Sequence, residues 1–297
     1  MGRQACLKSN FKGTTEKVIT QVAKNHLLYE KEGYLAKITL NRPEALNAFS
    51  VPMIRGWAKA LQDAQDDPAI RVIVVTARGK AFCAGGDTKT MLSGKGFMAD
   101  DEQGDAWGSL ALDRKRALTE YIHKIALTLE NMDKPVVCGI NGVAVGAGLD
   151  MALMCDIRIA AESAKISSGY VKAGLVPGDG GAYYMPRIVG VAKTLELMWT
   201  GDFITAAEAE RLGLVNKVVP DEDLQRATLE TALKIAESPP VSVQMIKRAV
   251  YSAQRTQDLH TALDLISSHM AIVTEMADHK EALTAMQEKR KPNFRGN

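Results

Sequence analysis

Cysteine is scarce in this sequence, and its few cysteines show no paired spacing. Cys6, Cys83, Cys138 and Cys155 form no C-x-x-C motif. This pattern gives no sign of a structural zinc site or of a disulfide framework. We expect free thiols, a reducing compartment and no bound metal.

Net charge of one sign is also nearly absent. The formal net charge is +2, and basic side chains are interspersed with acidic ones. Proteins that bind nucleic acid usually show a clustered basic excess, so no nucleic-acid partner is expected. No apolar run approaches the length of a membrane span, so no membrane partner is expected either. Any anionic ligand must therefore be bound by local groups.

Several catalytic motifs are missing from the chain. There is no G-x-S-x-G sequence and no Ser-His-Asp pattern, and no loop matches G-x-G-x-x-G or a P-loop. The histidines lie in charged or amphipathic segments, at His26, His123, His260, His269 and His279. General acid–base chemistry would therefore fall to carboxylates.

The N-terminal segment, residues 1–24, lacks the apolar stretch of a secretory signal. Its start, "MGRQAC", misses the myristoylation pattern because Cys6 stands where serine or threonine is needed. A mobile tail on a cytoplasmic protein is the preferred interpretation. An organelle-targeting segment is the alternative, since the tail is basic and poor in acids.

Composition is ordinary for a globular protein, with 46% hydrophobic and 24% charged residues. A chain of 297 residues favours one large domain with an appendage. We divide it into a tail (1–24), a core (25–221) and a C-terminal helical region (222–297). The helices expected in that last region cover Leu224–Glu237, Val241–Ala253, Leu259–Met276 and about Lys280–Lys289.

Strands and helices alternate through the core. Two short strands are predicted around a turn at Lys31 to Gly33, followed by helical spacing at Met53, Trp57, Leu61 and Ala64. Further buried strands are predicted at Val72–Thr76, "VVCGINGVAVG", "DIRIAA" and "GLVNKVVP", with a loop-and-helix stretch over about 88–131. This alternation predicts the α/β fold class.

Two glycine-rich loops follow buried strands: "FCAGGDTK" (Phe82–Lys89) and "NGVAVGAGLD" (Asn141–Asp150). Glycine lets backbone N–H groups approach a ligand closely, and a helix start has N–H groups without partners. Two such groups aimed at one point would form an oxyanion hole, worth roughly 3 kcal/mol per donor. For either loop alone, a tight strand-to-helix turn is the favoured interpretation.

Two acids stand beside glycines near expected helix starts: Asp150 in "GAGLD" and Asp179 in "GLVPGDGGAYY". Each could take part in acid–base chemistry. Each could equally cap a helix or complement its dipole, for about 1 kcal/mol. Taken singly, the capping role is favoured for both.

In combination, the motifs resemble the enoyl-CoA hydratase/isomerase family, also called the crotonase superfamily. The resemblance runs from about Leu27 to Phe294 and rests on motifs in the family's order: "ITLNRPEALNAFS", "AFCAGGDTK", "DKPVVCGINGVAVGAGLDMALMCDIRIA", "GLVPGDGGAYYMPRIVG", "WTGDFITAAEAERLGLVNKVVP" and "EKRKPNF". It implies a crotonase-like spiral of β-β-α units. It also implies that the C-terminal helices pack against neighbouring subunits, as a homotrimer or homohexamer.

The resemblance implies roles for particular residues. The N–H groups of Gly86 and Ala147 match those that bind the thioester carbonyl and stabilise an enolate. The loop along the CoA moiety matches Ala84, Gly85, Asp87, Thr88 and Lys89, with Lys89 near the nucleotide. Met286 and Lys289 match terminal-helix positions that reach a CoA nucleotide, often across a subunit boundary. A cluster of cations at residues 289–291 fits phosphate recognition, and a solvated tail is the alternative. CoA is expected as part of the substrate, with no tightly bound cofactor.

The sequence departs from the family's hydratases at the acid–base pair, which consists of two glutamates there. Asp150 stands at the first position and Tyr170 at the second, so Asp179 is a candidate for the missing partner. The expected function is an enoyl-CoA hydratase. An enoyl-CoA isomerase or a C–C hydrolase of an alicyclic acyl-CoA is the alternative on the same scaffold. A non-catalytic CoA-binding or scaffolding protein is the alternative of another class. The segment Met91–Lys115, with Phe97, Met98 and Trp107, is expected to shape the acyl pocket.

Overall fold

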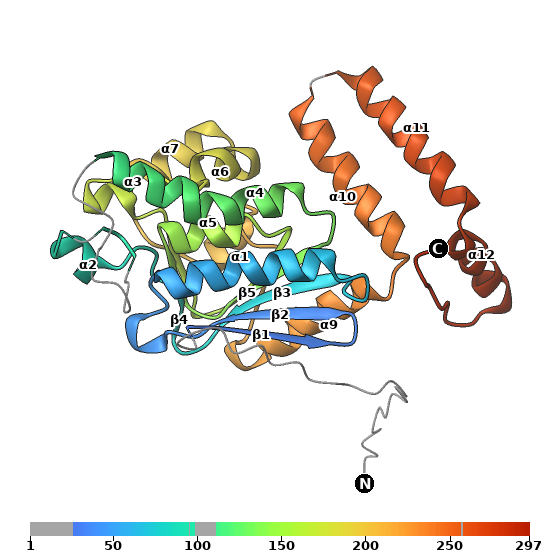
Figure 1. Cartoon of the computed structure of the whole chain (residues 1–297), viewed down its shortest axis with the longest axis horizontal. Helices are drawn as coiled ribbons and strands as arrows, with labels where there is room; N and C mark the ends of the chain where they lie inside the picture. The colour runs from blue at the N-terminus through green and yellow to red at the C-terminus, as the bar shows by residue number, and fades with distance from the viewer. Residues whose placement is uncertain (1–25, 95, 99–110, 257) are drawn as a thin grey trace, which may run out of the picture.

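The computed structural model describes residues 26–94, 96–98, 111–256 and 258–297 (Figure 1). The predicted tail, residues 1–24, and Trp107 lie outside the described residues. Among the described residues, the strands form two sheets. The larger sheet has the order β1 (Leu27–Glu32), β2 (Leu35–Leu40), β3 (Val72–Ala77), β5 (Val136–Ile140), β7 (Ile157–Ala161) and β10 (Lys217–Val219).

Only the β1–β2 pair of the larger sheet is antiparallel; the other neighbouring strands run parallel. Parallel strands are buried on both faces, which explains runs such as "VIVV" in β3. Val72 and Val74 pack with Ala232 of α9 (Leu224–Ala236), whereas Ile73 and Val75 belong to the larger core on the opposite face. Figure 1 shows α1 (Val51–Asp66) on that opposite side.

A smaller sheet of four short strands carries the loops of interest. Its order is β4 (Ala81–Cys83), β6 (Val143–Val145), β8 (Lys165–Ser167) and β9 (Ile204–Thr205). The first three run parallel, and β9 is antiparallel to β8. The carboxyl ends of β4, β6 and β8 therefore lie at one edge of this sheet.

The sequence predicted a single strand in "VVCGINGVAVG", and this was wrong. The chain forms β5, turns at Asn141 and Gly142, and enters β6 in the other sheet. A Cβ at Gly142 would lie 2.2 Å from the Lys80 carbonyl oxygen. The glycine thus allows a close backbone approach where the chain changes sheets. The first predicted turn is also shifted, because β1 continues to Glu32 and the left-handed residue of the turn is Gly33.

Helices connect the strands and form the C-terminal region. Those of the core include α2 (Thr88–Leu92), α3 (Ala111–Ala117), α4 (His123–Asn131), α5 (Ala147–Leu153), α6 (Gly181–Val189), α7 (Val191–Thr200) and α8 (Ala206–Arg211), with a π-helical turn at Leu118–Ile122. The C-terminal helices are α9, α10 (Pro240–Arg255), α11 (Leu259–Glu275) and α12 (Ala277–Glu288). The helices α9, α10 and α11 each begin within one residue of the predicted start. The helix α12 begins at Ala277, about three residues before the predicted start at Lys280.

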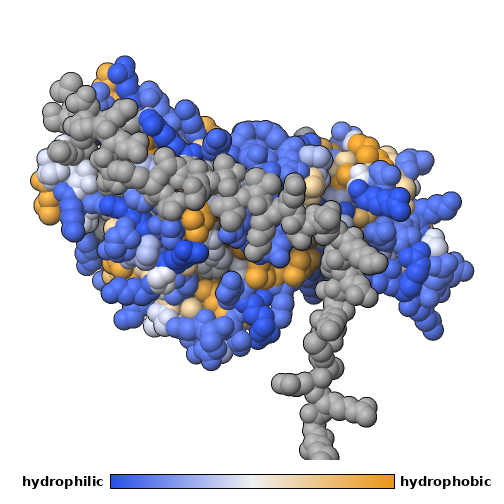
Figure 2. Space-filling model, turned by 60° about the horizontal axis from the view of Figure 1, so that its bottom comes forward, coloured by the Kyte–Doolittle hydropathy of each residue, from blue (hydrophilic) through white to orange (hydrophobic). Residues whose placement is uncertain are grey.

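The C-terminal helices α10, α11 and α12 project from the core as an arm (Figure 1). The base of the arm is fixed to the core by Asp156, whose carboxylate accepts hydrogen bonds from Lys247 and Tyr251 of α10, both at 2.8 Å. Neither α10 nor α11 has a buried residue. Hydrophobic side chains are accordingly visible on the surface of the arm, at the right of Figure 2.

Candidate active site

Three loops meet at the edge where β4, β6 and β8 end. They are the "AGGD" loop after β4, the turn from β6 into α5, and the segment between β8 and α6. The first two touch backbone to backbone. A Cβ at Gly85 would lie 2.8 Å from the Val145 carbonyl oxygen, and one at Gly148 would lie 2.2 Å from the Cys83 carbonyl oxygen. Only glycine permits this contact.

This contact brings together the two proposed oxyanion donors. Gly86 and Ala147, which come from the two touching loops, line one cavity. Ala147 is the first residue of α5, so its N–H has no acceptor within the helix. No hydrogen bond joins the Gly86 N–H to another residue in the described part of the chain. Neither N–H group is therefore bound to an acceptor among the residues that the structure describes.

The cavity has a volume of about 390 Å³. Its lining is mainly apolar, with Phe49, Met91, Phe97, Leu118, Leu175 and Val176 beside Arg114, Tyr170 and Asp179. The expected pocket segment, Met91–Lys115, therefore contributes Met91, Phe97 and Arg114 to the lining. Met98 is instead buried in the main core.

Asp150, Tyr170 and Asp179 form one hydrogen-bonded cluster. The Tyr170 Oη lies 2.7 Å from an oxygen of Asp150 and 2.7 Å from an oxygen of Asp179. The Gly181 N–H donates to the same Asp150 oxygen at 2.9 Å. A phenol has one proton to donate. The second short contact therefore requires a protonated carboxyl that donates to the phenol oxygen.

Burial explains why a carboxyl keeps a proton here. Asp150 is 1% exposed and Asp179 is 5% exposed. Burial, and next the charge of Asp179, raise the pKa of Asp150 to about 7, although hydrogen bonds from Tyr170 and the Gly181 N–H work against this rise. Burial likewise raises the pKa of Asp179. Burial and the two carboxyls raise the pKa of Tyr170, so the phenol stays protonated.

The two acids differ in their access to the cavity. Asp179 lines it, whereas Asp150 is packed behind, so close to Gly181 that a Cβ there would lie 2.2 Å from Asp150 Oδ1. Oδ1 of each acid is buried and accepts no hydrogen bond from any residue that the structure describes. A buried carboxyl oxygen without a donor is costly. Because Asp179 lines the cavity and Asp150 does not, Asp179 is the acid placed to meet a ligand.

The residues predicted to bind CoA are divided between two places. Ala84 and Gly85 lie in the loop beside the cavity, and Thr88 and Lys89 begin α2 with exposed side chains. The Asp87 carboxylate is already engaged, because it caps α2 and pairs with Arg42.

Met286 and Lys289 lie on or just after α12, and Figure 1 places α12 at the opposite end of the molecule from α2. One chain therefore does not bring them to the cavity. The cationic cluster at residues 289–291 is also largely neutralised. Arg290 pairs with Glu281 and Glu288, and Lys291 pairs with Glu237.

Sequence reasoning did not identify three residues near this site. The His123 Nε2 lies 2.8 Å from the Gly178 carbonyl oxygen, next to Asp179. Arg114 lines the cavity, and Arg42 holds Asp87. Arg42 belongs to the motif "ITLNRPEALNAFS" quoted above, so the sequence did mark the segment that contains it. Its partner is 45 residues away, and no local pattern connects the two.

No helix within the described ranges is long and apolar enough to cross a membrane. No group of three or more His, Cys, Asp or Glu side chains in the described residues could hold a metal ion.

Comparison with known proteins identifies relatives over nearly the whole chain. Residues 30–297 match the model of the enoyl-CoA hydratase/isomerase family. A 1,2-epoxyphenylacetyl-CoA isomerase of Escherichia coli is 35% identical over 91% of this chain and 98% of its own length. A crotonyl-CoA hydratase of Syntrophomonas wolfei is 34% identical over 92% of this chain and 99% of its own.

Solved structures agree with the fold. The crystal structure of an enoyl-CoA hydratase from Bacillus anthracis has a TM-score of 0.81 and 33% identity, and the match covers 92% of this chain and 100% of that one. The predicted crotonase-like α/β fold with C-terminal helices is thereby confirmed.

Proposed function

The chain belongs to the enoyl-CoA hydratase/isomerase family, and on this premise we propose that it adds water to the double bond of a 2-enoyl-CoA thioester. One observation carries the proposal: two carboxyls joined through a phenol stand beside a cavity that two backbone N–H groups also line. Relatives bearing the names crotonyl-CoA hydratase and short-chain-enoyl-CoA hydratase support it.

In this reaction the N–H groups of Gly86 and Ala147 donate to the thioester oxygen. Electrons of the C2–C3 double bond move onto that oxygen as the water oxygen bonds to C3, giving an enolate. Each donor lowers the barrier by roughly 3 kcal/mol, because it meets charge that develops only as the reaction proceeds.

The acid cluster handles the protons. Asp179 takes a proton from the attacking water, and the enolate carbon C2 then receives a proton from the same cluster. The cluster therefore begins and ends with one shared proton on its two carboxyls. Tyr170 relays that proton between Asp179 and Asp150, and its raised pKa keeps it neutral throughout.

A second candidate reaction is migration of a double bond along the acyl chain. Its specific support is that Asp179 lines the cavity and Asp150 does not. An isomerase needs one group to carry a proton from one carbon to another, and one accessible acid suits that task. The relative named 1,2-epoxyphenylacetyl-CoA isomerase adds support.

Product analysis distinguishes these reactions. The purified protein is incubated with crotonyl-CoA, with a 3-enoyl-CoA and with a cyclic β-keto acyl-CoA. Chromatography against authentic standards identifies the products, because double-bond isomers have the same mass, and mass spectrometry detects the addition of water. We expect a 3-hydroxyacyl-CoA from crotonyl-CoA. A 2-enoyl product from the 3-enoyl substrate alone would assign the isomerase, and ring opening alone would assign the hydrolase. Thermal stabilisation by all three without turnover would leave a non-catalytic CoA-binding protein.

CoA enters this scheme as part of the substrate, and the proposal includes no tightly bound cofactor. Cys83, Cys138 and Cys155 are free and buried. These thiols support a reducing compartment, and we place the enzyme in the cytoplasm.

We further propose that the enzyme is a homotrimer or homohexamer built through its C-terminal arm. Apolar residues repeat along one face of α11 at Leu259, Leu263, Ile266 and Met270, all of them exposed in the single chain. A stripe of this kind is typical of a surface that another protein covers. In such an assembly, Met286 and Lys289 of one subunit would reach the CoA bound to another.

Charges placed on the α11 stripe should dissociate the assembly. The variant Leu263→Glu/Ile266→Glu is expected to raise the dissociation constant at least about 100-fold, since burying each such side chain contributes about 1.5–3 kcal/mol. Light scattering coupled to gel filtration measures the molar mass. Ser268→Glu, an exposed position on the other side of α11, is the matched control and should keep the wild-type mass. A wild-type protein that is already monomeric would overturn the proposal.

A further inference from the structure

The "AGGD" loop is hydrogen-bonded through its backbone to a second loop, Arg42–Phe49. The Ala84 N–H donates to the Leu46 carbonyl at 3.0 Å, and the Phe49 N–H donates to the Gly85 carbonyl at 2.7 Å. These two bonds attach the two residues that precede Gly86. The second loop is therefore a backbone template for the residues just before Gly86.

The bond from Phe49 also sets the direction of the Gly86 N–H. The Gly85 carbonyl and the Gly86 N–H belong to one planar trans peptide unit, in which they point in opposite directions. Fixing the carbonyl at Phe49 therefore fixes the N–H on the other side. Phe49 and Gly86 both line the cavity, so a rotation of this peptide would turn the proposed oxyanion donor away from its target.

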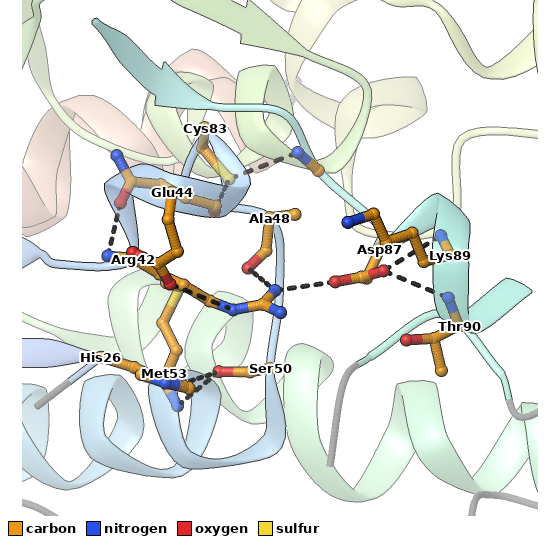
Figure 3. A network of polar contacts seen from close by, with 12 residues as sticks. His26, Arg42, Glu44, Ala48, Ser50, Met53, Cys83, Asp87, Lys89 and Thr90 are labelled. Carbon is orange, nitrogen blue, oxygen red and sulfur yellow. Dashed lines mark hydrogen bonds and ion pairs between the residues drawn. The ribbon is translucent and has the colours of Figure 1, made fainter. Parts of the chain in front are cut away.

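Arg42 ties the template loop to the far side of the "AGGD" turn (Figure 3). Its Nη1 donates to Asp87 Oδ2 at 2.8 Å and to the Ala48 carbonyl at 3.1 Å. Its backbone N–H donates to the Asn47 side chain at 2.7 Å. Asp87 directly follows Gly86, so one guanidinium joins the residue after the donor to the residue before Phe49.

Asp87 is itself fixed in place. Its other oxygen accepts from the N–H groups of Lys89 and Thr90 at 3.1 Å each, which caps α2. Burial works to raise the pKa of Asp87, but the hydrogen bonds from Arg42 and the Thr90 N–H outweigh it and the pKa lies below its ordinary value. The ion pair is consequently charged at neutral pH, and the Arg42 side chain is only 13% exposed.

We propose that Arg42, through its pair with Asp87 and its bond to the Ala48 carbonyl, is a positioning residue that aims the Gly86 N–H at the thioester oxygen. This inference rests on the proposed function, because it gives Arg42 a task only where a thioester carbonyl is bound. An ion pair that merely stabilises the fold would leave the bound carbonyl unaffected.

The test measures carbonyl polarisation directly. Butyryl-CoA labelled with ¹³C at the thioester carbonyl has no double bond, so it binds without turnover. Isotope-edited infrared spectroscopy compares its carbonyl stretch free and bound. Wild-type protein should lower the stretching frequency, and Arg42→Met should lose more than half of that shift while the dissociation constant rises less than about threefold. With the substrate that the product analysis identifies, kcat should fall about 10- to 100-fold, less than the 10²–10³ of a lost donor.

Three further variants separate positioning from general loss of stability. Asp87→Asn keeps a cap acceptor and removes the charge, so it carries the same test where Arg42→Met does not fold. The double variant should lose no more of the carbonyl shift than Arg42→Met alone, because Arg42→Met already breaks the ion pair with Asp87. Arg226→Met, on α9, breaks two exposed ion pairs, with Asp223 and with Glu230, and should leave the carbonyl shift and kcat unchanged.

Two results would overturn the inference, and they are distinguishable. A full carbonyl shift in folded Arg42→Met or Asp87→Asn would remove the positioning role and leave the proposed function standing. No binding of butyryl-CoA by wild-type protein, or binding without a carbonyl shift, would overturn the proposed function and this inference with it.

Discussion

Asp150→Asn should lower turnover by about 10²–10⁴-fold while the protein stays folded. The Gly181 N–H and Tyr170 Oη both contact Oδ2 of Asp150, and an asparagine carbonyl oxygen at that place can accept from both. The variant thus keeps an uncharged acceptor at this place but carries no acidic proton. The proton can no longer move, because an amide does not exchange it with Tyr170. Measured kcat with intact binding of substrate checks this expectation.

The same substitution should stabilise the protein at high pH. The folded-state pKa of Asp150 is about 7, above the ordinary unfolded value of about 3.9. Between these values the native state binds more protons than the unfolded state, so wild-type stability falls as pH rises through that window. Asparagine has no such dependence. The stability gain should be near zero at pH 4 and reach the order of a few kcal/mol above pH 7, by urea unfolding at both pH values.

Tyr170→Phe is the natural comparison for Asp150→Asn. It removes the bridging hydroxyl but keeps both acids and the ring. If the proton moves through Tyr170, this variant should also lose turnover, and its pH–rate profile should lose the dependence that the shared proton creates. Wild-type turnover in folded Asp150→Asn would exclude Asp150 from the chemistry. Wild-type turnover in Tyr170→Phe would leave the tyrosine with a packing role.

Local patterns were sufficient to predict the two glycine-rich loops, whereas the grouping of the two acids came only from the resemblance to the family. Glycines in "AGGD" and "GAGLD" marked the close backbone approach, and the family's motif order placed Asp150 and Asp179 in one site. Spacing could not show that Tyr170 touches both acids. Nor could it show that Asp179 lines the cavity while Asp150 lies behind it, since access depends on packing between separate loops.

Other features were beyond local patterns for different physical reasons. The short strands β4, β8 and β9 have at most three residues each, too few for a periodic signal. The step from β5 to β6 depends on the contact of Gly142 with Lys80, which the sequence does not display. The cations at residues 289–291 looked available for phosphate until Glu281 and Glu237 were found beside them.

Gly148→Ala should be among the most damaging single-methyl changes in this protein. Alanine is the better helix former by about 0.8–1.0 kcal/mol, so α5 alone would gain from it. The added Cβ, however, would lie 2.2 Å from the Cys83 carbonyl oxygen and 2.7 Å from its carbon. Backbone atoms cannot rotate away, so the end of β4 and the start of α5 must separate. Overpacking of this kind costs about 1–3 kcal/mol or more.

The functional loss should exceed what that stability loss implies. Gly86 follows β4 and Ala147 begins α5, so the two proposed donors stand on opposite sides of the contact that Gly148 permits. Separating them displaces at least one donor from the thioester oxygen. We expect kcat to fall about 10²–10³-fold, as for the loss of one oxyanion donor, in steady-state assays of folded protein.

Gly178→Ala provides the control for stability. A Cβ there would meet the Leu118 methyl groups at 3.6 Å, an ordinary van der Waals contact, so unfolding should change by less than about 1 kcal/mol. A loss of stability in both variants would point to a general intolerance of added methyl groups. A Gly148→Ala protein with wild-type stability and wild-type turnover would mean that β4 and α5 have room to move apart. The donor pair of Gly86 and Ala147 would then not depend on this contact.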